Sequence, residues 1–188
     1  MTNEQTDEEI ARRVQAGESD LFGELIERYQ PKLMRYARKF LFDPEDGADL
    51  VQDTFIKSYE NIKSFDASRR FSPWIYRIAH NEFVNALKKK QSSRTTFAFD
   101  IDTLFPHLAA PETADSAVLE RDLRESLERY LDKLDPKYRE PLILYYLESM
   151  DYKEISDILQ IPVSTVGVRL GRARGILKKI AADGQNIV

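Results

Sequence analysis

The residues best suited to chemistry lie near the carboxyl end of the chain and are all basic. Between Val163 and Ala182 every charged side chain is positive, and these side chains are Arg169, Arg172, Arg174, Lys178 and Lys179. Apolar residues recur through the same stretch at three- and four-residue spacing, namely Val163, Val166, Leu170, Ala173 and Leu177. This pattern predicts an amphipathic helix with a positively charged outer face. Such a face can lie against the phosphates of a nucleic acid.

A second apolar repeat directly precedes this basic helix. Its members recur at helical spacing and are Tyr152, Ile155, Ile158 and Leu159. The turn between the two helices falls at residues 160–162, where Pro162 marks the start of the second helix because proline is tolerated only in a first turn. Two short helices with a tight turn are typical of a helix-turn-helix, whose second helix reads DNA. The alternative is an ordinary packing unit with a solvated basic face.

The net charge of −4 conceals an alternation of acidic and basic blocks. Residues 1–64 carry −5, residues 65–94 carry +5, residues 95–117 carry −4, residues 118–162 carry −4 and residues 163–188 carry +4. Two basic blocks separated by acidic ones predict two contacts with nucleic acid. They also predict at least one acidic surface for a different partner.

The residue types that perform most catalysis and metal binding are scarce in this chain. It has no cysteine, and its two histidines, His80 and His107, lie far apart in the sequence. We therefore expect no disulfide, no metal site, no cofactor and no enzymatic activity. The first residues are acidic and polar, and no apolar run is long enough to cross a bilayer. We therefore expect no membrane insertion and a cytoplasmic location.

Helical periodicity extends over most of the chain and predicts an all-α fold. The first helix is expected at residues 7–16, and the second begins near Leu21 and should bend or restart at Pro31. An acidic-faced helix is expected within residues 43–65. A fourth helix should start at Pro73, after a loop over residues 66–73.

The periodicity is lost between Gln91 and Ala117, where Ser, Thr, Pro and Asp gather. This stretch is longer than the usual connection inside a compact domain. We therefore predict two small helical domains, residues 1–92 and residues 117–188, joined by a flexible acidic linker at residues 93–116. The second domain contains the helix-turn-helix.

Three passages, taken together and in order, resemble one protein family. They read DLVQDTFIKSYENIKSF at residues 49–65, FSPWIYRIAHNEFVNALKKK at residues 71–90, and PVSTVGVRLGRARGILKK at residues 162–179. The chain resembles the extracytoplasmic-function (group 4) sigma factors, members of the sigma-70 family of bacterial RNA polymerase subunits, over residues 7–182. The resemblance implies a first domain (region 2) that binds core polymerase and reads and melts the minus 10 promoter element. It implies a second domain (region 4) that reads the minus 35 element.

The resemblance also implies partners and contact residues. The partners are core RNA polymerase, through the clamp helices of its largest subunit and through its beta subunit, promoter DNA, and an anti-sigma factor. The implied core-binding residues are Asp49, Gln52, Asp53, Phe55 and Tyr59. The implied minus 10 contacts are Arg69, Arg70, Trp74, Arg77, Asn81, Lys88, Lys89 and Lys90. The implied minus 35 contacts are Ser164, Thr165, Arg169, Arg172, Arg174 and Lys178.

Some of these residues have a second interpretation. Phe55 and Tyr59 can belong to the core of the first domain instead of a partner interface, and so can Trp74. In the family, a flipped base is captured by the loop before Trp74 and by the helix after it. In this chain these are the loop at residues 65–73 and, facing it, Asn81, whose amide can bond a base edge.

The outer line of the basic helix departs from the family pattern. It holds Ser164, Gly167, Val168, Gly171 and Gly175, whereas relatives commonly carry long basic or polar side chains at the positions of Gly167, Val168 and Gly171. Because each interior glycine costs about 1 kcal/mol relative to alanine, we infer that the bare face lets another surface approach closely. That surface is DNA, an inhibitory partner or the first domain. The alternative is drift on a solvated face.

Two other functions remain open from the residues alone. One is a helix-turn-helix regulator that binds operator DNA as a dimer, without polymerase. The other is a helical interaction module with no role in nucleic-acid binding, for which the basic blocks are only solvated faces.

Overall fold

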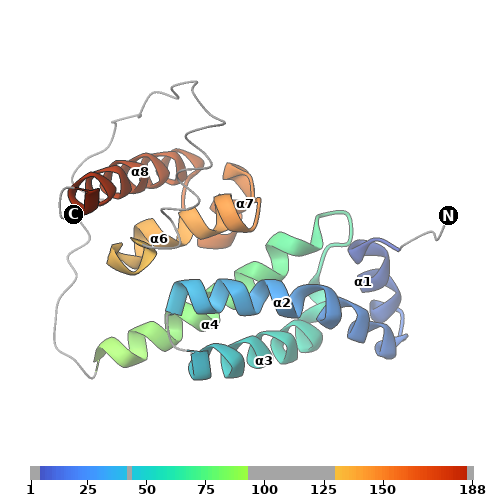
Figure 1. Cartoon of the computed structure of the whole chain (residues 1–188). Coiled ribbons are helices and arrows are strands. Elements are labelled where there is room, and N and C mark those ends of the chain that lie inside the picture. Colours follow the sequence, from blue (N-terminus) through green and yellow to red (C-terminus); the bar gives the residue numbers. More distant parts are fainter. Residues whose placement is uncertain (1–4, 42–43, 93–129, 186–188) are drawn as a thin grey trace. The chain divides into compact units, whose positions relative to one another are not determined.

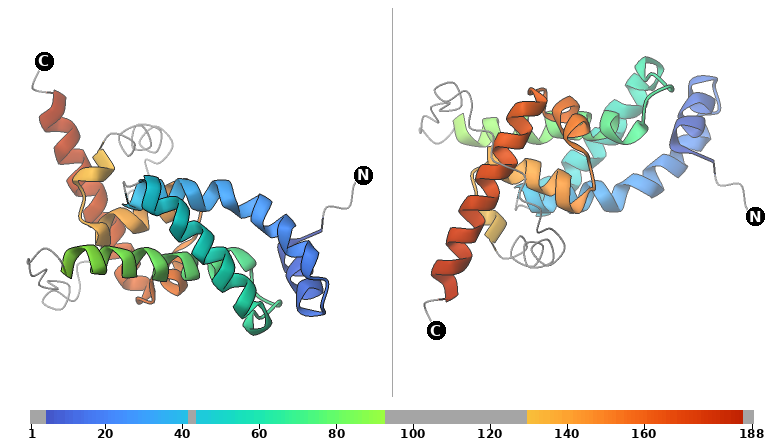
Figure 2. Two further views of the ribbon diagram at one scale, coloured as in Figure 1. Left: turned by 90° about the horizontal axis from the view of Figure 1, so that it is seen from below. Right: turned by 90° about the horizontal axis from the view of Figure 1, so that it is seen from above.

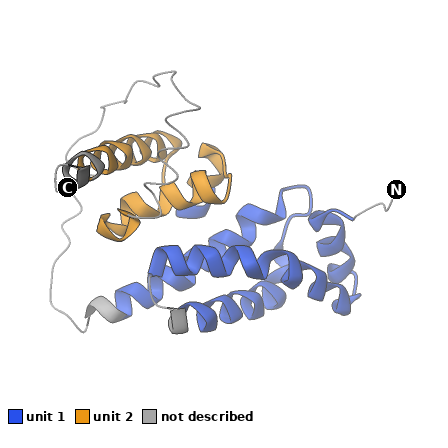
Figure 3. Ribbon diagram, viewed as in Figure 1, with its two compact units in different colours: residues 1–95, 157–159 blue, residues 96–156, 160–188 orange. Residues whose placement is uncertain are grey.

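The structure is a computed structural model that describes residues 5–41, 44–92 and 130–185, and all regular elements in these ranges are helical (Figure 1). The chain divides into two compact units, one of residues 1–95 with 157–159 and the other of residues 96–156 and 160–188 (Figure 3). The all-α prediction is confirmed. The predicted linker at residues 93–116 lies outside the described residues, so the domain boundaries stay a prediction.

Four α-helices form the first unit: α1 (Asp7–Gln15), α2 (Phe22–Leu41), α3 (Pro44–Asn61) and α4 (Phe71–Ser92). The turns η1 (Ser19–Leu21) and η2 (Ile62–Ser64) precede α2 and follow α3. Helix α2 packs along α3, and α3 along α4, as the views in Figure 2 show.

An aromatic cluster forms the centre of this unit. The ring of Tyr36 on α2 lies 5.5 Å from that of Tyr76 and 5.0 Å from that of Phe83, both on α4. These side chains, with Leu33 and Ile75, are inaccessible to solvent or nearly so. The cluster therefore determines which face of α4 is buried and which faces outward.

Helix α2 runs through Pro31 as one element, so of the two expected outcomes at this proline, a bend or a restart, the restart does not occur. Pro31 is solvent-exposed, so the carbonyl that loses its intrahelical partner can bond to water. Helix α4 begins at Phe71, two residues before the predicted start. The backbone N–H of Phe71 donates to Glu8 Oε1 at 2.8 Å, so a side chain of α1 satisfies the first turn of α4.

Helix α1 is fastened to α2 by a polar contact in which Asp7 has two partners. The Tyr29 hydroxyl donates to Asp7 Oδ2 at 2.6 Å, and Arg28 Nη1 donates to Asp7 Oδ1 at 2.7 Å. Burial and the hydrogen bond to Asp7 hold the pKa of Tyr29 far above its ordinary value. Tyr29 therefore stays protonated and remains a donor at physiological pH.

The described residues from 130 onward form η4 (Leu131–Lys133), α6 (Pro136–Leu142), the π-helical turn η5 (Ile143–Leu147), α7 (Tyr152–Leu159) and α8 (Val163–Gln185), and all of them except residues 157–159 belong to the second unit. The predicted apolar stripe of α8 is fully buried at Val166, Leu170, Ala173 and Leu177. Val163 is an exception at 46% exposed. It is the first residue of the helix, and the stripe reaches the core only from Val166 onward.

We predict that Tyr29→Phe lowers the free energy of unfolding by about 1 kcal/mol or more, because the change leaves one oxygen of the half-buried Asp7 carboxylate without its donor. Urea denaturation of the full chain measures this difference. The matched control is Tyr59→Phe, since Tyr59 is 46% exposed and keeps its ring contact with Phe22. Equal unfolding midpoints for the two variants would contradict the role assigned to the Asp7 contact.

Candidate functional site

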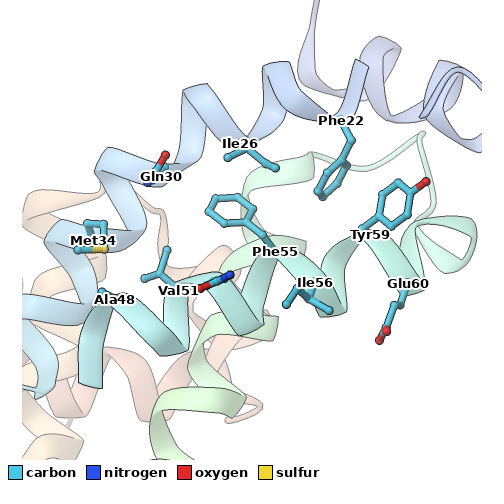
Figure 4. Close-up of a pocket in the computed structure, with 11 residues that line it drawn as sticks. Phe22, Ile26, Gln30, Met34, Ala48, Val51, Phe55, Ile56, Tyr59 and Glu60 are labelled. Atoms are coloured by element: carbon cyan, nitrogen blue, oxygen red, sulfur yellow. The ribbon is translucent and has the colours of Figure 1, made fainter. Parts of the chain in front are cut away.

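An apolar groove of about 810 Å³ lies between α2 and α3 (Figure 4). Its walls are formed by Phe22, Ile26, Met34, Ala48, Val51, Phe55 and Ile56, with Gln30, Gln52, Tyr59 and Glu60 at its polar positions. Ile56 is 49% exposed, and the ring of Tyr59 meets that of Phe22 edge to face at 5.2 Å. Large exposed apolar side chains beside a groove are characteristic of a surface that binds a partner.

The predicted core-binding residues gather at this groove. Gln52, Phe55 and Tyr59 line it, while Asp49 and Asp53 are exposed on the same helix, α3. Phe55 is only 7% exposed, so it is at once a core residue and a wall of the groove. Asp49, Gln52 and Asp53 share one face by their spacing, which sets carboxylates and an amide beside the apolar surface.

Sequence reasoning did not separate Ile56 from the core, and it did not find the α2 side of the groove. The apolar spacing of α3 grouped Ile56 with the buried stripe, but it lies at the edge of that stripe and faces solvent. Ile26 and Met34 sit on α2 at the same kind of edge position. The sequence signal that could have indicated the groove is the apolar stripe of α3, which is wider than the core requires.

The loop between η2 and α4 has an aromatic base. Phe65 and Phe71 are buried on either side of it, and their rings meet edge to face at 5.3 Å. Trp74 contacts both rings, at 5.2 and 5.4 Å, and is half-buried. Trp74 therefore packs on the buried rings while remaining partly exposed, and its contact with DNA stays a prediction.

The loop itself is an ordered turn. Asp66 Oδ1 accepts hydrogen bonds from the backbone N–H and the hydroxyl of Ser68, at 3.0 and 2.7 Å. These bonds hold the pKa of the Asp66 carboxyl below its ordinary value, so it remains an ionised acceptor at neutral pH. The N–H of Arg69 donates to the Asp66 carbonyl at 2.9 Å. The turn presents Arg69 and Arg70 to solvent.

The outer face of α4 aligns most of the remaining predicted minus 10 contacts. Arg77, Asn81 and Lys88 are exposed, and their spacing places them on one face, in line with Trp74. Lys89 is also exposed, whereas the side chain of Lys90 lies outside the described residues. Asn81 follows Phe71, where the loop ends and α4 begins, by roughly three turns, about 15 Å along the helix axis, so it extends the line from Trp74.

An ion pair joins the groove helix to the α4 helix. Lys57 Nζ lies 2.6 Å from Glu82 Oε2, and the Glu82 side chain is largely covered. The acidic face of α3 and the basic face of α4 thus lie on two helices that pack against each other.

Helices α7 and α8 form the predicted helix-turn-helix. A reciprocal capping box between Asp151 and Glu154 starts α7. The helix ends at Gln160, which has a left-handed φ of 55°. The hydroxyl of Ser156 then donates to the Ile161 carbonyl at 2.6 Å and closes the turn before α8.

The predicted minus 35 residues lie along α8 but differ in exposure. Ser164 and Lys178 are exposed, whereas Thr165, Arg169 and Arg172 are partly exposed. Gly167, Gly171 and Gly175 form the glycine line of α8. A Cβ added at Gly167 would lie 3.6 Å from Tyr152 Cε2, an ordinary contact, and one added at Gly175 would meet nothing within 4 Å.

Arg174 of α8 packs against two tyrosines that precede α7 in the chain. Its Nε donates to the Tyr146 hydroxyl at 2.8 Å, and its guanidinium lies over the rings of Tyr145 and Tyr146, at 5.8 and 5.7 Å from their centres. The structure therefore gives Arg174 a packing role that the sequence did not indicate. Only the tertiary structure brings the two tyrosines to this position.

Other kinds of site are not found in the part of the chain that the structure describes. No group of three or more His, Asp or Glu side chains there could hold a metal ion. Among the same residues, no helix is sufficiently long and apolar to span a membrane.

Comparison with known proteins identifies the class. The family model for Sigma-70 region 2 matches residues 25–93, which include all the groove residues except Phe22, the loop and α4, and that for Sigma-70, region 4 matches residues 124–177. The chain is 31% identical over 180 residues to the ECF RNA polymerase sigma factor SigW of Bacillus subtilis, covering 92% of this chain and 95% of that one. It is 30% identical to the ECF RNA polymerase sigma-E factor of Haemophilus influenzae, over 95% of this chain and 96% of that one.

Solved structures agree with this assignment. CnrH, solved in complex with the cytosolic domain of CnrY, superposes with a TM-score of 0.68 at 26% identity and covers 95% of this chain and 99% of its own. The sigma factor RpoE of Bartonella quintana, solved with the anti-sigma factor NepR, has a TM-score of 0.65 at 25% identity, covering 86% and 96%.

The chain therefore belongs to the ECF sigma factors of the sigma-70 family. Its function is that of an alternative RNA polymerase sigma factor, which binds core polymerase and directs promoter-specific transcription initiation. The alternative interpretation as a stand-alone helix-turn-helix regulator is set aside, because the matches cover both domains and not the helix-turn-helix alone.

We predict that Arg174→Ala destabilises the second unit by about 1–2 kcal/mol, because the change removes a hydrogen bond and two cation–π contacts. Thermal unfolding of the full chain, followed by tyrosine fluorescence, measures the loss. Lys178→Ala removes an exposed charge from the same helix and serves as the control. If both variants unfold like the wild type, the packing role of Arg174 is wrong.

Proposed function

We propose that the α2–α3 groove and the acidic face of α3 form the docking surface for core RNA polymerase. The main support is that Ile56 and Tyr59 remain exposed at the groove, while Asp49 and Asp53 are exposed on the same helix, α3. A helix that presents apolar residues on one side and basic residues beside them would match this surface. The clamp helices of the largest polymerase subunit are the proposed occupant, and the beta subunit is a further proposed contact.

The loop at residues 65–70 and the outer face of α4 are the proposed minus 10 reader. The exposed Arg69 and Arg70 can hold backbone phosphates, and the accessible side of Trp74 can stack on a base. Asn81 can bond a base edge. Further contacts to backbone phosphates are proposed for Lys88, Lys89 and Lys90. The ordered turn at Asp66 favours this role because a preorganised loop loses little entropy on binding.

Helix α8 is the proposed minus 35 reader. Ser164 and Thr165 lie in its first turn, the part of a recognition helix that normally meets base edges. Arg169, Arg172 and Lys178 are proposed phosphate contacts. Arg174 keeps its proposed place in this set only as a residue that orients the helix, because Tyr146 holds its guanidinium.

Binding polymerase and promoter DNA requires no chemical step, so we propose that the protein acts without enzymatic activity, metal or cofactor. It is placed in the cytoplasm because RNA polymerase works there. An anti-sigma factor is proposed as a further partner, since the similar sigma factor RpoE was solved with the anti-sigma factor NepR. The domain boundaries at residues 1–92, 93–116 and 117–188 are retained as part of this proposal.

We predict that the double change Asp49→Lys and Asp53→Lys abolishes association with core polymerase, because it places like charges opposite the basic partner surface. Gel filtration and pull-down with purified core enzyme measure the association. The fold should survive, since an exposed charge change usually alters stability by less than about 0.5 kcal/mol.

The matched control for the docking test is Asp20→Lys with Asp132→Lys, which makes the same charge change at exposed positions outside the groove. This variant should co-elute with core enzyme like the wild type. Unchanged co-elution of the Asp49 and Asp53 variant would exclude the acidic face as a docking element.

The glycine line of α8 gives a test of close approach to DNA. The double change Gly167→Ala and Gly171→Ala should raise stability by about 1 kcal/mol per site, since alanine favours a helix. Under the proposal it should also weaken promoter binding, because the added methyl groups separate the helix from DNA. Gly175→Ala, which faces open space farther along the helix, is the control and should gain stability alone. A more stable double variant with unchanged promoter affinity would mean that DNA does not approach these glycines closely, and that they arose by sequence drift on a solvated face.

A further inference from the structure

The loop at residues 65–70 is held at both ends by side chains of α1. At its start, Gln15 Nε2 donates to the carbonyls of Ile62 and Phe65, each at 2.7 Å. At its end, Glu8 Oε1 accepts the backbone N–H of Phe71 at 2.8 Å. Helix α1 thus spans the loop from outside, although it is far from the loop in sequence.

The side-chain amide of Gln15 makes a forked contact, in which one nitrogen donates to two carbonyl oxygens, and a glutamine is well suited to make it. A primary amide carries two N–H donors on one nitrogen, and both of the oxygens near Nε2 are backbone carbonyls. The Ile62 carbonyl also accepts the N–H of Phe65 at 3.0 Å, so the fork closes over a tight turn. A glutamate of the same shape has no donor and would face two acceptors.

The contact of Glu8 acts on the first turn of α4. The first N–H groups of a helix have no intrahelical partner, and a carboxylate there also stabilises the positive end of the helix. Phe71 is fully buried, so water has little access to its amide. Glu8 therefore contributes to fixing where α4 starts and where its outer face begins.

Helix α1 is rigid enough to serve as a brace. Ile10 and Ala11 are fully buried, and Asp7 is bound by Arg28 and Tyr29 of α2. Arg13 and Glu18 form an ion pair at its far end. A displacement of the loop relative to α1 would break bonds at both ends of the loop.

We propose that Gln15 and Glu8 are positioning residues for minus 10 recognition, acting on DNA only through the loop backbone and the first turn of α4. This inference rests on the proposed role of the loop as a DNA reader. Preorganisation of a binding loop by supporting side chains raises both its affinity and its selectivity. Residues of α1 thereby determine minus 10 preference from a helix outside the loop and α4.

The test uses holoenzyme reconstituted from the full chain and core polymerase. The probe is a pool of linear DNA randomised across the minus 10 and minus 35 elements, and transcribed molecules are sequenced. Gln15→Glu should lower the ratio of transcription from preferred over disfavoured minus 10 sequences by about tenfold. This is a loss of about 1.4 kcal/mol in discrimination. The preference at minus 35 positions and the affinity for core enzyme should not change.

The matched control is Gln5→Glu, which makes the same charge change just before α1. The side-chain oxygen of Gln5 accepts from Arg13 Nη1 at 3.1 Å, a contact that a carboxylate preserves. This variant should keep the wild-type preference at both elements. Equal minus 10 profiles for the Gln5 and Gln15 variants overturn the inference.

Two further variants keep the test decisive if Gln15→Glu does not fold. Gln15→Met removes the donors without adding charge, and Glu8→Ala removes the cap of α4. Each should speed hydrogen exchange of the Ser68 and Arg69 amides about tenfold in the free protein and flatten minus 10 preference. Faster exchange with an unchanged minus 10 profile overturns the inference, because the contacts would then be purely structural.

Arg69→Ala and Arg70→Ala in the same assay separate this inference from the proposed function. If they alter minus 10 preference while the Gln15 and Glu8 variants do not, the loop reads DNA and only the role of α1 is wrong. If they leave minus 10 preference intact, the loop is not the reader and both proposals are overturned.

Discussion

The burial of one face of α4 against α2 is the interaction on which the arrangement of the first unit depends. Tyr36 of α2 contacts Tyr76 and Phe83 of α4, and these rings exclude solvent from the centre of the unit. Because one face of α4 is committed to this cluster, the opposite face must carry Arg77 and Asn81 outward. The same packing leaves α3 with one face inside and one face exposed. A core contact thus determines where both proposed functional surfaces of this unit lie.

The charges of the chain are divided into acidic and basic segments, which suits a protein with two kinds of partner. The net charge is −4, yet residues 65–94 carry +5 and residues 163–188 carry +4. A uniformly basic chain would attract DNA without selectivity, since phosphate contacts alone read no sequence. Acidic surface elsewhere weakens such binding and supplies carboxylates for a basic partner. The negative net charge is therefore compatible with a DNA-binding initiation factor.

The described structure agrees with that of sigma factors that share only about a quarter of its residues. CnrH superposes with a TM-score of 0.68 at 26% identity. Packing tolerates many apolar exchanges as long as the pattern and volume are kept, so the helical core can persist while surface residues change. Specificity then depends on a few exposed positions and on what holds them. In this chain the loop at residues 65–70, the proposed minus 10 reader, carries exposed arginines on a turn closed by Asp66 and Ser68.

The sequence alone determined the helical fold class, the helix-turn-helix and the family, because these depend on apolar spacing, proline placement and motif order within short stretches. Tertiary structure decided what depends on residues far apart in the chain. Glu8 moves the start of α4 to Phe71, Tyr146 withdraws Arg174 from the outer face of α8, and α2 turns part of the apolar stripe of α3 into an open groove. Periodicity predicts that a side chain lies on one face of a helix. Whether a neighbouring element covers that face is determined only when the helices pack.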